Sequence, residues 1–259
     1  MIFGFKRAVC VLAMSLFAGS ARGEDPLMVF AAASLTEPFT ELGALYESRV
    51  PGATVTFVFA GAQRLSMQLN DGAQADVFAS ANRKEMDAVR AGGLAADSDV
   101  RLFAANELIA IVPADNPGQV QSLEELARPG LKVVLAAEDV PVGAYTRESL
   151  AKMESRFGKG FQGRVLANVA SNEESVKQVL AKVRLGEADA GVVYRTDQVG
   201  LTDIESIPIP SEFNVRALYP VAVLKAAPQR DQAQAFVDLL FAAEGRAILQ
   251  KWGFLAAQP

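Results

Sequence analysis

The chain contains no histidine, and its only cysteine is Cys10. Histidine is the usual base in Ser-His-Asp and Cys-His catalysis and a common zinc ligand, so its absence excludes these sites. A Ser-Lys or paired-carboxylate enzyme stays open. An oxygen-only metal site also stays open, although the sequence has no EF-hand spacing of acidic residues. The missing residue types therefore exclude many hydrolases, but not every enzyme.

Long apolar runs are scarce as well, and the clearest one lies near the amino terminus. Two basic residues precede an apolar stretch over residues 8–18 that is too short to cross a bilayer. A small-x-small cleavage pattern follows it. We therefore predict a secretory signal peptide over residues 1–23, cleaved after Gly23 or after Ala21. No later stretch reaches eighteen apolar residues, so we expect an exported chain without a membrane anchor.

Positive charge is in short supply beyond this leader. The leader holds three of the 25 basic residues and none of the 30 acidic ones, which leaves 22 basic against 30 acidic residues, a net charge of −8. Such a chain is not expected to bind nucleic acid or an anionic membrane. Subtracting 23 residues from 259 leaves 236, which is enough for one large domain or for two α/β lobes.

What the sequence does contain is a repeated alternation of strand and helix patterns. The first strand is expected over residues 27–33, and Leu35, Phe39 and Leu42 then mark one face of a helix. Alternation of this kind predicts an α/β fold with mostly parallel sheets flanked by helices, whose ligands bind beyond the carboxyl ends of the strands. Further strands are expected over residues 54–59, 75–80, 107–113, 131–136, 164–170, 189–194 and 217–225.

Small residues stand where several of these strands turn into helices. Ser34 follows three alanines, and Ala62 lies in a Gly-Ala turn. Val142 follows a proline at a helix start, Val176 lies in the first turns of another helix, and Tyr194 ends a strand. Helix N-termini that are not covered by bulky side chains expose backbone N–H groups. Several such corners, together with a tyrosine hydroxyl, are suited to bind one small oxyanion.

Each of these features also has a purely structural explanation. Ser34 and Glu37 fit a capping box, as do Ser122 and Glu125, to which we assign no function. Small residues at helix starts commonly reflect close packing, and valines belong to the core by default. A single tyrosine usually packs with its hydroxyl at the surface. Only the combination of corners favours a ligand site.

A glycine motif does not predict nucleotide binding. Residues 158–163 match G-x-G-x-x-G, but the residues before them, 148–157, have a helical pattern and those after them, 164–170, a strand pattern. A dinucleotide-binding motif needs a strand first and a helix second. We interpret the motif as a loop and expect residues 171–174 to open the next helix.

Specific motifs occur along nearly the whole chain. The most specific are Ala-Asp-Val-Phe-Ala-Ser at residues 75–80 and Val-Pro-Val-Gly-Ala-Tyr at residues 140–145. Together the motifs resemble those of the periplasmic molybdate-binding proteins of ABC transporters. The resemblance implies a two-lobed class II periplasmic binding protein that is not an enzyme. It would close on a tetrahedral oxyanion and deliver it to a membrane permease with its cytoplasmic ATPase. The other matching segments are residues 30–36, 59–63, 191–194 and 244–254.

The resemblance also implies where the ligand binds and how the lobes divide. The ligand would be molybdate or tungstate, with no further cofactor, bound by a monomer in the periplasm. The first lobe would comprise residues 24–104 and 217–259 and the second residues 105–216, with crossings near residues 104–106 and 214–218. The ligand contacts carried over from the family fall on Ser34, Ala62, Val142, Val176 and Tyr194.

Ala62 departs from the family pattern, which has a serine there. The change removes a hydroxyl donor and leaves the backbone N–H. Gln63, Arg64 or a water molecule could replace the missing donor. We therefore expect oxyanion binding with weaker or altered selectivity.

Two other functions stay open. The first is a binding protein of the same fold for another oxyanion such as sulfate or for a small organic acid. An organic acid usually needs an arginine that clamps its carboxylate, and Arg64, Arg147 and Arg195 lie near the expected corners. The second is an exported enzyme, which turnover would distinguish from a binding protein.

Overall fold

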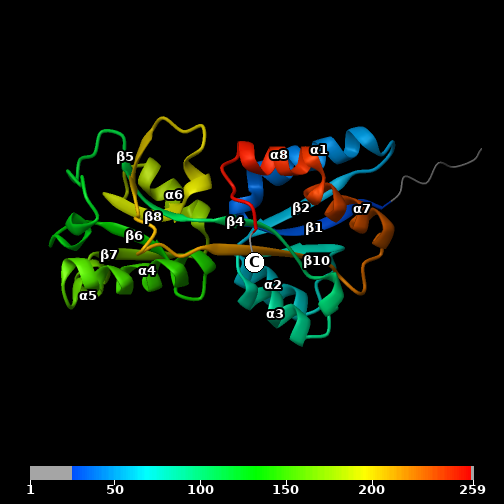
Figure 1. The fold of residues 1–259 in the computed structure, drawn as a ribbon, viewed down its shortest axis with the longest axis horizontal. Coiled ribbons are helices and arrows are strands. Elements are labelled where there is room, and N and C mark those ends of the chain that lie inside the picture. Colours follow the sequence, from blue (N-terminus) through cyan, green and yellow to red (C-terminus); the bar gives the residue numbers. More distant parts are fainter. Residues whose placement is uncertain (1–24, 258–259) are drawn as a thin grey trace, which may run out of the picture.

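The computed structural model describes residues 25–257, and the predicted signal peptide lies outside this range. The described chain folds into two α/β lobes that lie side by side, each built on a five-stranded sheet (Figure 1). Within residues 25–257, no helix is long and apolar enough to cross a membrane. The predicted two-lobed α/β architecture is therefore confirmed.

The first sheet has the strand order β2-β1-β3-β10-β4. Strand β1 is parallel to β2 and β3, whereas β10 is antiparallel to β3 and β4. Four strands thus point one way and β10 points the other. Its strands are β1 (Leu27–Ala32), β2 (Val55–Ala60), β3 (Val77–Ala79), β4 (Arg101–Asn106) and β10 (Ala217–Val223).

The second sheet repeats this plan with the order β7-β6-β8-β5-β9. Strand β6 is parallel to β7 and β8, and β5 is antiparallel to β8 and β9. The reversed strand of each sheet is the one that follows a passage between the lobes. Its strands are β5 (Leu108–Pro113), β6 (Val133–Ala136), β7 (Val169–Glu173), β8 (Ala190–Tyr194) and β9 (Ile204–Pro208).

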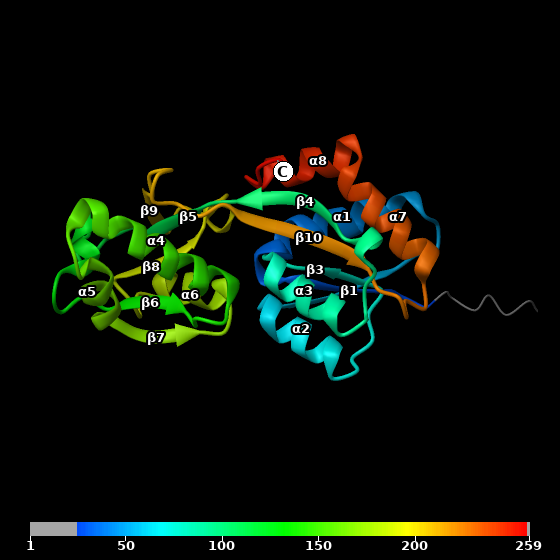
Figure 2. The same ribbon diagram turned by 60° about the horizontal axis from the view of Figure 1, so that its bottom comes forward.

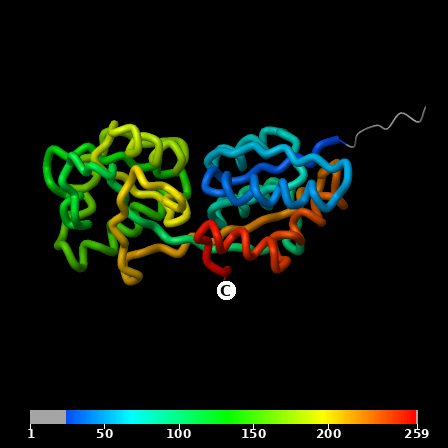
Figure 3. Tube along the Cα trace, turned by 90° about the horizontal axis from the view of Figure 1, so that it is seen from above, coloured from blue at the N-terminus to red at the C-terminus, as the bar shows by residue number. Residues whose placement is uncertain are grey.

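The chain passes between the two sheets twice. It leaves the first sheet at Asn106 and enters the second at Leu108, and it returns between Pro208 and Ala217. Figures 2 and 3 show these two connections side by side, with the C-terminal helices back against the first lobe. Two adjacent connections of this kind form a hinge, because a small backbone rotation in each changes the angle between the lobes.

Helices cover both faces of each sheet, as Figure 1 shows. In the first sheet, alternate side chains of one strand serve opposite faces, so Phe30 packs with α2 and α3 whereas Val29 and Ala31 pack with α1. The helices of the first lobe are α1 (Thr36–Arg49), α2 (Ala62–Asn70), α3 (Arg83–Ala91), α7 (Arg230–Phe241) and α8 (Ala243–Lys251). Those of the second lobe are α4 (Pro141–Phe157), α5 (Phe161–Ala167) and α6 (Val176–Arg184).

The predicted strand over residues 164–170 and the helix start at residues 171–174 are wrong. Residues 161–167 form α5, because Phe161 and Val165 are one helical turn apart and both are buried. Strand β7 then runs over residues 169–173 at the sheet edge, where polar side chains can alternate toward solvent. Strands β4 and β9 were not expected.

Aromatic rings join distant parts of the chain in the first lobe. The Phe39 ring centroid on α1 lies 5.8 Å from that of Phe103 on β4 and 5.9 Å from that of Phe236 on α7. Phe39 is fully buried. The Phe39–Phe236 pair is edge-to-face and the Phe39–Phe103 pair is tilted, and such ring contacts add to the hydrophobic contribution of each ring. The C-terminal helix α7 is thereby fixed to the helix and sheet of the first lobe.

Replacing Phe39 by alanine should lower the free energy of unfolding of the first lobe by about 3–5 kcal/mol, because a cavity replaces a buried ring. Denaturant unfolding followed by circular dichroism measures the change. Met67→Ala is the control, since the Met67 side chain is exposed on α2. Equal stability of the two variants would contradict this account of the core.

Candidate functional site

The five residues expected to contact the ligand line a single small pocket between the lobes. All five are buried in the described structure, with at most 4% of any of them exposed. Residues from β1, the start of α2, the starts of α4 and α6 and the end of β8 meet here. The lining residues are Ala32, Ala33, Ser34, Gly61, Ala62, Ala81, Val140, Pro141, Val142, Val176 and Tyr194.

Three α-helices begin at this pocket. Helix α2 begins at Ala62, α4 begins at Pro141 just before Val142, and α6 begins at Val176. The first N–H groups of a helix have no acceptor within the helix, and the helix dipole adds partial positive charge there. Among the described residues, no charged side chain lines the pocket. The polarity of the site therefore comes from backbone donors and neutral hydroxyl groups.

Two glycines allow the backbone to approach this closely. A Cβ atom at Gly143 would lie 1.9 Å from the carbonyl oxygen of Ala137, so only glycine lets α4 start against the end of β6. A Cβ atom at Gly61 would lie 2.5 Å from the carbonyl oxygen of Glu174 in the other lobe. The small residues noted in the sequence thus serve close packing as well as an open helix end.

Tyr194 contributes a buried hydroxyl that has no hydrogen-bond partner of good geometry among the described residues, although the Tyr219 hydroxyl is close enough to add to the rise that burial causes in its pKa. Its backbone N–H donates to Asp197 Oδ2 at 3.0 Å, which fixes the end of β8. Burial raises the pKa of the Tyr194 phenol well above its ordinary value, so the group stays protonated. A buried unpaired hydroxyl at a pocket wall is suited to donate to a ligand.

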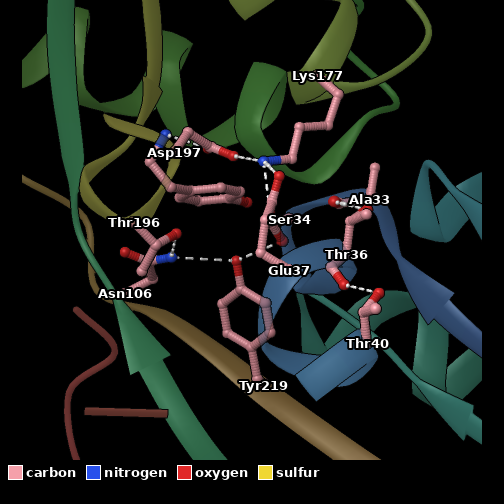
Figure 4. A network of polar contacts seen from close by, with 11 residues as sticks. Ala33, Ser34, Thr36, Glu37, Thr40, Asn106, Lys177, Thr196, Asp197 and Tyr219 are labelled. Carbon is pink, nitrogen blue, oxygen red and sulfur yellow. Dashed lines mark hydrogen bonds and ion pairs between the residues drawn. The ribbon is translucent and has the colours of Figure 1, made fainter. Parts of the chain in front are cut away.

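Ser34 does not cap the first helix. It lies in a short 3-10 turn, α1 begins at Thr36 without a side-chain cap, and the capping-box interpretation is therefore wrong here. Ser34 Oγ instead lies 2.9 Å from the hydroxyl of Tyr219 on β10. Asn106 Nδ2 donates to the same hydroxyl at 3.4 Å and to Thr196 Oγ1 at 2.9 Å (Figure 4).

Three residues of this group were not predicted from the sequence: Tyr219, Asn106 and Thr196. Tyr219 is 185 positions from Ser34, and no local pattern marks the pair. A weak signal was nevertheless present, since Asn106 is a polar residue in the apolar run where a crossing between the lobes was expected.

A second polar group spans the lobes beside the pocket. Lys177 Nζ lies 2.8 Å from Glu37 Oε2 in the first lobe and 3.1 Å from Asp197 Oδ1 in the second (Figure 4). Burial acts to lower the pKa of Lys177, but the carboxylates of Asp197 and Glu37 outweigh it and the net shift is upward. Burial also raises the pKa of Asp197, against the opposing effect of Lys177. The ammonium group therefore stays charged and links the lobes.

Gln63 and Arg64 do not supply the donor that Ala62 lacks. Gln63 Nε2 donates to the carbonyl oxygen of Glu174 at 3.1 Å, and Arg64 forms an ion pair with the Glu174 carboxylate. Both contacts join the lobes at the surface, and neither side chain lines the pocket. The gap left at Ala62 is thus not covered by its neighbours in the sequence.

The other arginines do not form a carboxylate clamp either. Arg147 donates to the carbonyl oxygens of Ala136 and Gly143, at 3.0 and 2.9 Å. The side chain of Arg195 is 53% exposed and lies 4.0 Å from Glu107. In the described part of the chain, no group of acidic residues is placed to hold a metal ion. The pocket is suited to a small anion bound by neutral donors.

Comparison with known proteins gives the family. The family model described as "Bacterial extracellular solute-binding protein" matches residues 27–255. The molybdate-binding protein ModA of Mycobacterium tuberculosis is 40% identical over 238 residues, which cover 92% of this chain and 87% of that protein. The resemblance drawn from the motifs is thereby confirmed.

Two solved structures share the fold. The periplasmic molybdate-binding protein of Azotobacter vinelandii superposes with a TM-score of 0.79 at 19% identity, covering 90% of this chain and all of that one. The sulfate-binding protein SubI of Mycobacterium tuberculosis gives the same TM-score at 15% identity, covering 90% of this chain and 88% of that one. Fold alone therefore does not identify the anion.

The matched family consists of proteins that bind solutes rather than transform them, which removes the enzyme alternative. The family model spans both sheets and every residue of the pocket. The chain belongs to the bacterial extracellular solute-binding proteins.

Proposed function

We propose that this chain is the extracytoplasmic receptor that binds molybdate, and also tungstate, for an ABC transporter. The observation that carries the proposal is the meeting of three helix N-termini and the Tyr194 hydroxyl at one pocket without charged side chains. The 40% identity to a molybdate-binding protein supports molybdate over sulfate, because the sulfate-binding protein SubI, at 15% identity, shares the fold alone.

The ligand would be held through neutral donors. N–H groups at Ala62, Val142 and Val176, with the hydroxyls of Ser34 and Tyr194, would face the oxygens of a tetrahedral dianion. Partial positive charge at the helix ends offsets the charge of the anion without a lysine or arginine. Donors at fixed positions in a dry pocket also select by size. Molybdate and tungstate are large enough to reach all the donors, whereas the smaller sulfate would fit loosely.

Binding would close the lobes over the anion. The first lobe in this proposal comprises residues 24–104 and 217–259, and the second comprises residues 105–216. The leader would direct export to the periplasm and be cleaved there. The protein would act as a monomer. The ligand contacts both lobes, so it favours the closed arrangement that the permease and its ATPase would recognise. Contacts of Glu37, Gln63 and Arg64 with the second lobe support this arrangement.

Titration calorimetry with an anion panel tests the ligand. Saturable heat with molybdate and tungstate is expected, with weaker binding of sulfate because fewer donors reach the smaller anion. Absence of both heat and a thermal shift with all three anions would rule out the proposal. Tightest binding of a small organic acid would favour the alternative instead.

Ala62→Ser should tighten molybdate binding, since it restores a hydroxyl beside a buried anion oxygen. An unpaired buried group costs about 1–3 kcal/mol, so affinity should rise about fivefold or more by calorimetry. Ala62→Gly is the matched control, because it keeps the backbone N–H and adds no donor. A serine variant with unchanged or weaker binding would show that no donor acts at this position.

Glu37→Gln should speed release of molybdate. The change removes the carboxylate that Lys177 contacts across the lobes and leaves the Lys177–Asp197 pair intact. A partly exposed pair contributes up to about 1 kcal/mol, so stopped-flow measurements should show a two- to fivefold faster off-rate. Glu41→Gln is the control, because Glu41 on the same helix pairs with Lys251 within the first lobe. Equal off-rates for both variants would contradict a role for Glu37 in closure.

A further inference from the structure

A chain of four polar side chains runs from the hinge to Ser34. Asn106 ends β4 at the first passage between the lobes, and Tyr219 lies near the start of β10 after the second. Thr196 follows β8 in the second lobe. Asn106 and Tyr219 are completely buried, and Ser34 and Thr196 are nearly so. Polar groups buried this deeply cannot turn to water, so their donors and acceptors must match one another.

The orientation of the Asn106 amide is set by the backbone. The N–H of Glu107 donates to Asn106 Oδ1 at 3.0 Å. A backbone N–H can only donate, so the atom facing it is the amide oxygen. The NH₂ group must then face Thr196 Oγ1 and the Tyr219 hydroxyl, at 2.9 and 3.4 Å.

The donor direction passes from this amide to Ser34. The NH₂ group can only donate, so the Tyr219 oxygen accepts from it. Burial raises the pKa of Tyr219, which therefore keeps its proton and donates it to Ser34 Oγ at 2.9 Å. Ser34 then accepts from Tyr219, and its own hydrogen is left to point elsewhere. Ser34 lines the pocket, so that hydrogen is available to a ligand there.

We propose that Asn106 and Tyr219 are positioning residues that fix Ser34 as a hydrogen-bond donor toward the bound oxyanion. The inference depends on the proposed function, since it concerns the same pocket. It means that the two strands of the hinge set the polarity of a ligand contact in the first lobe. We call the hydrogen bonds from Asn106 through Tyr219 to Ser34 the relay. Without the relay, Ser34 would present either its hydrogen or a lone pair to the anion, and a lone pair repels an anion oxygen.

Asn106→Asp reverses the relay with almost no change of shape. One carboxylate oxygen still accepts from the Glu107 N–H, but the other now accepts where the NH₂ group donated. Tyr219 then turns its hydrogen toward residue 106 and accepts from Ser34, which shows a lone pair to the anion. We expect molybdate affinity to fall about 10- to 100-fold, in line with one lost and one repulsive contact to a buried charge.

The new carboxylate also repels the anion directly, and a double-mutant cycle separates the two effects. Tyr219→Phe keeps the ring, which packs against Phe103 and Phe254, and removes the hydroxyl that transmits the direction. In the otherwise unchanged protein, Asn106→Asp should reduce molybdate affinity by the factor given above. In the Tyr219→Phe background, it should reduce the affinity by less than a third of that factor. The same factor in both backgrounds would mean repulsion alone and would overturn the proposal.

Tyr219→Phe alone keeps the test decisive if the aspartate variant does not fold. It should weaken molybdate binding about three- to tenfold at an unchanged far-UV spectrum, because Ser34 loses its fixed partner. Tyr46→Phe is the matched control, since it removes a tyrosine hydroxyl on α1 that bonds Gln232 outside the pocket. Unchanged affinity in Tyr219→Phe would overturn the relay. Failure of the unaltered protein to bind molybdate would instead overturn the proposed function.

Discussion

A small dianion taken out of water needs a hydrogen-bond donor for each of its oxygens, and this structure concentrates donors where helices start. The starts of α2, α4 and α6 meet at one pocket, so their first N–H groups lack partners within the helices. Close packing depends on the small residues there, above all Gly61 and Gly143. The arrangement of both sheets follows from this constraint, because each must end at the same pocket.

Charge is kept out of the pocket and placed beside it. Two basic side chains beside the pocket connect the lobes, and both have carboxylate partners. Lys177 lies between Glu37 and Asp197, and Arg64 pairs with Glu174. A free ammonium or guanidinium group in the pocket would attract any anion, whereas neutral donors of fixed geometry discriminate by shape. The ion pairs therefore serve closure, and the dipoles and hydroxyls serve recognition.

Much of the fold and of the site could be predicted from the sequence. Strand ends, helix starts and small residues at corners are determined by neighbouring residues, so the corners could be located. The resemblance to the family then implied the ligand contacts, and all five residues it marked line one pocket: Ser34, Ala62, Val142, Val176 and Tyr194. The segment from residue 164 to residue 174 failed because Val165 and Leu166 fit a helix face as well as a strand.

Long-range contacts were beyond the reach of such patterns. The hydrogen bonds of Ser34 with Tyr219 and of Asn106 with Thr196 join residues 185 and 90 positions apart. These residues meet only because the two passages between the lobes lie next to each other. Capping-box spacing at Ser34 was therefore a coincidence of sequence, and the serine's hydroxyl is used by the hinge strand instead.

The most direct test of the central claim is a crystal structure of the protein with molybdate bound. The anion should lie between the lobes. Its oxygens should be within hydrogen-bond distance of the N–H groups at Ala62, Val142 and Val176 and of the hydroxyls of Ser34 and Tyr194. An anion held by lysine or arginine side chains, or bound outside this pocket, would contradict it.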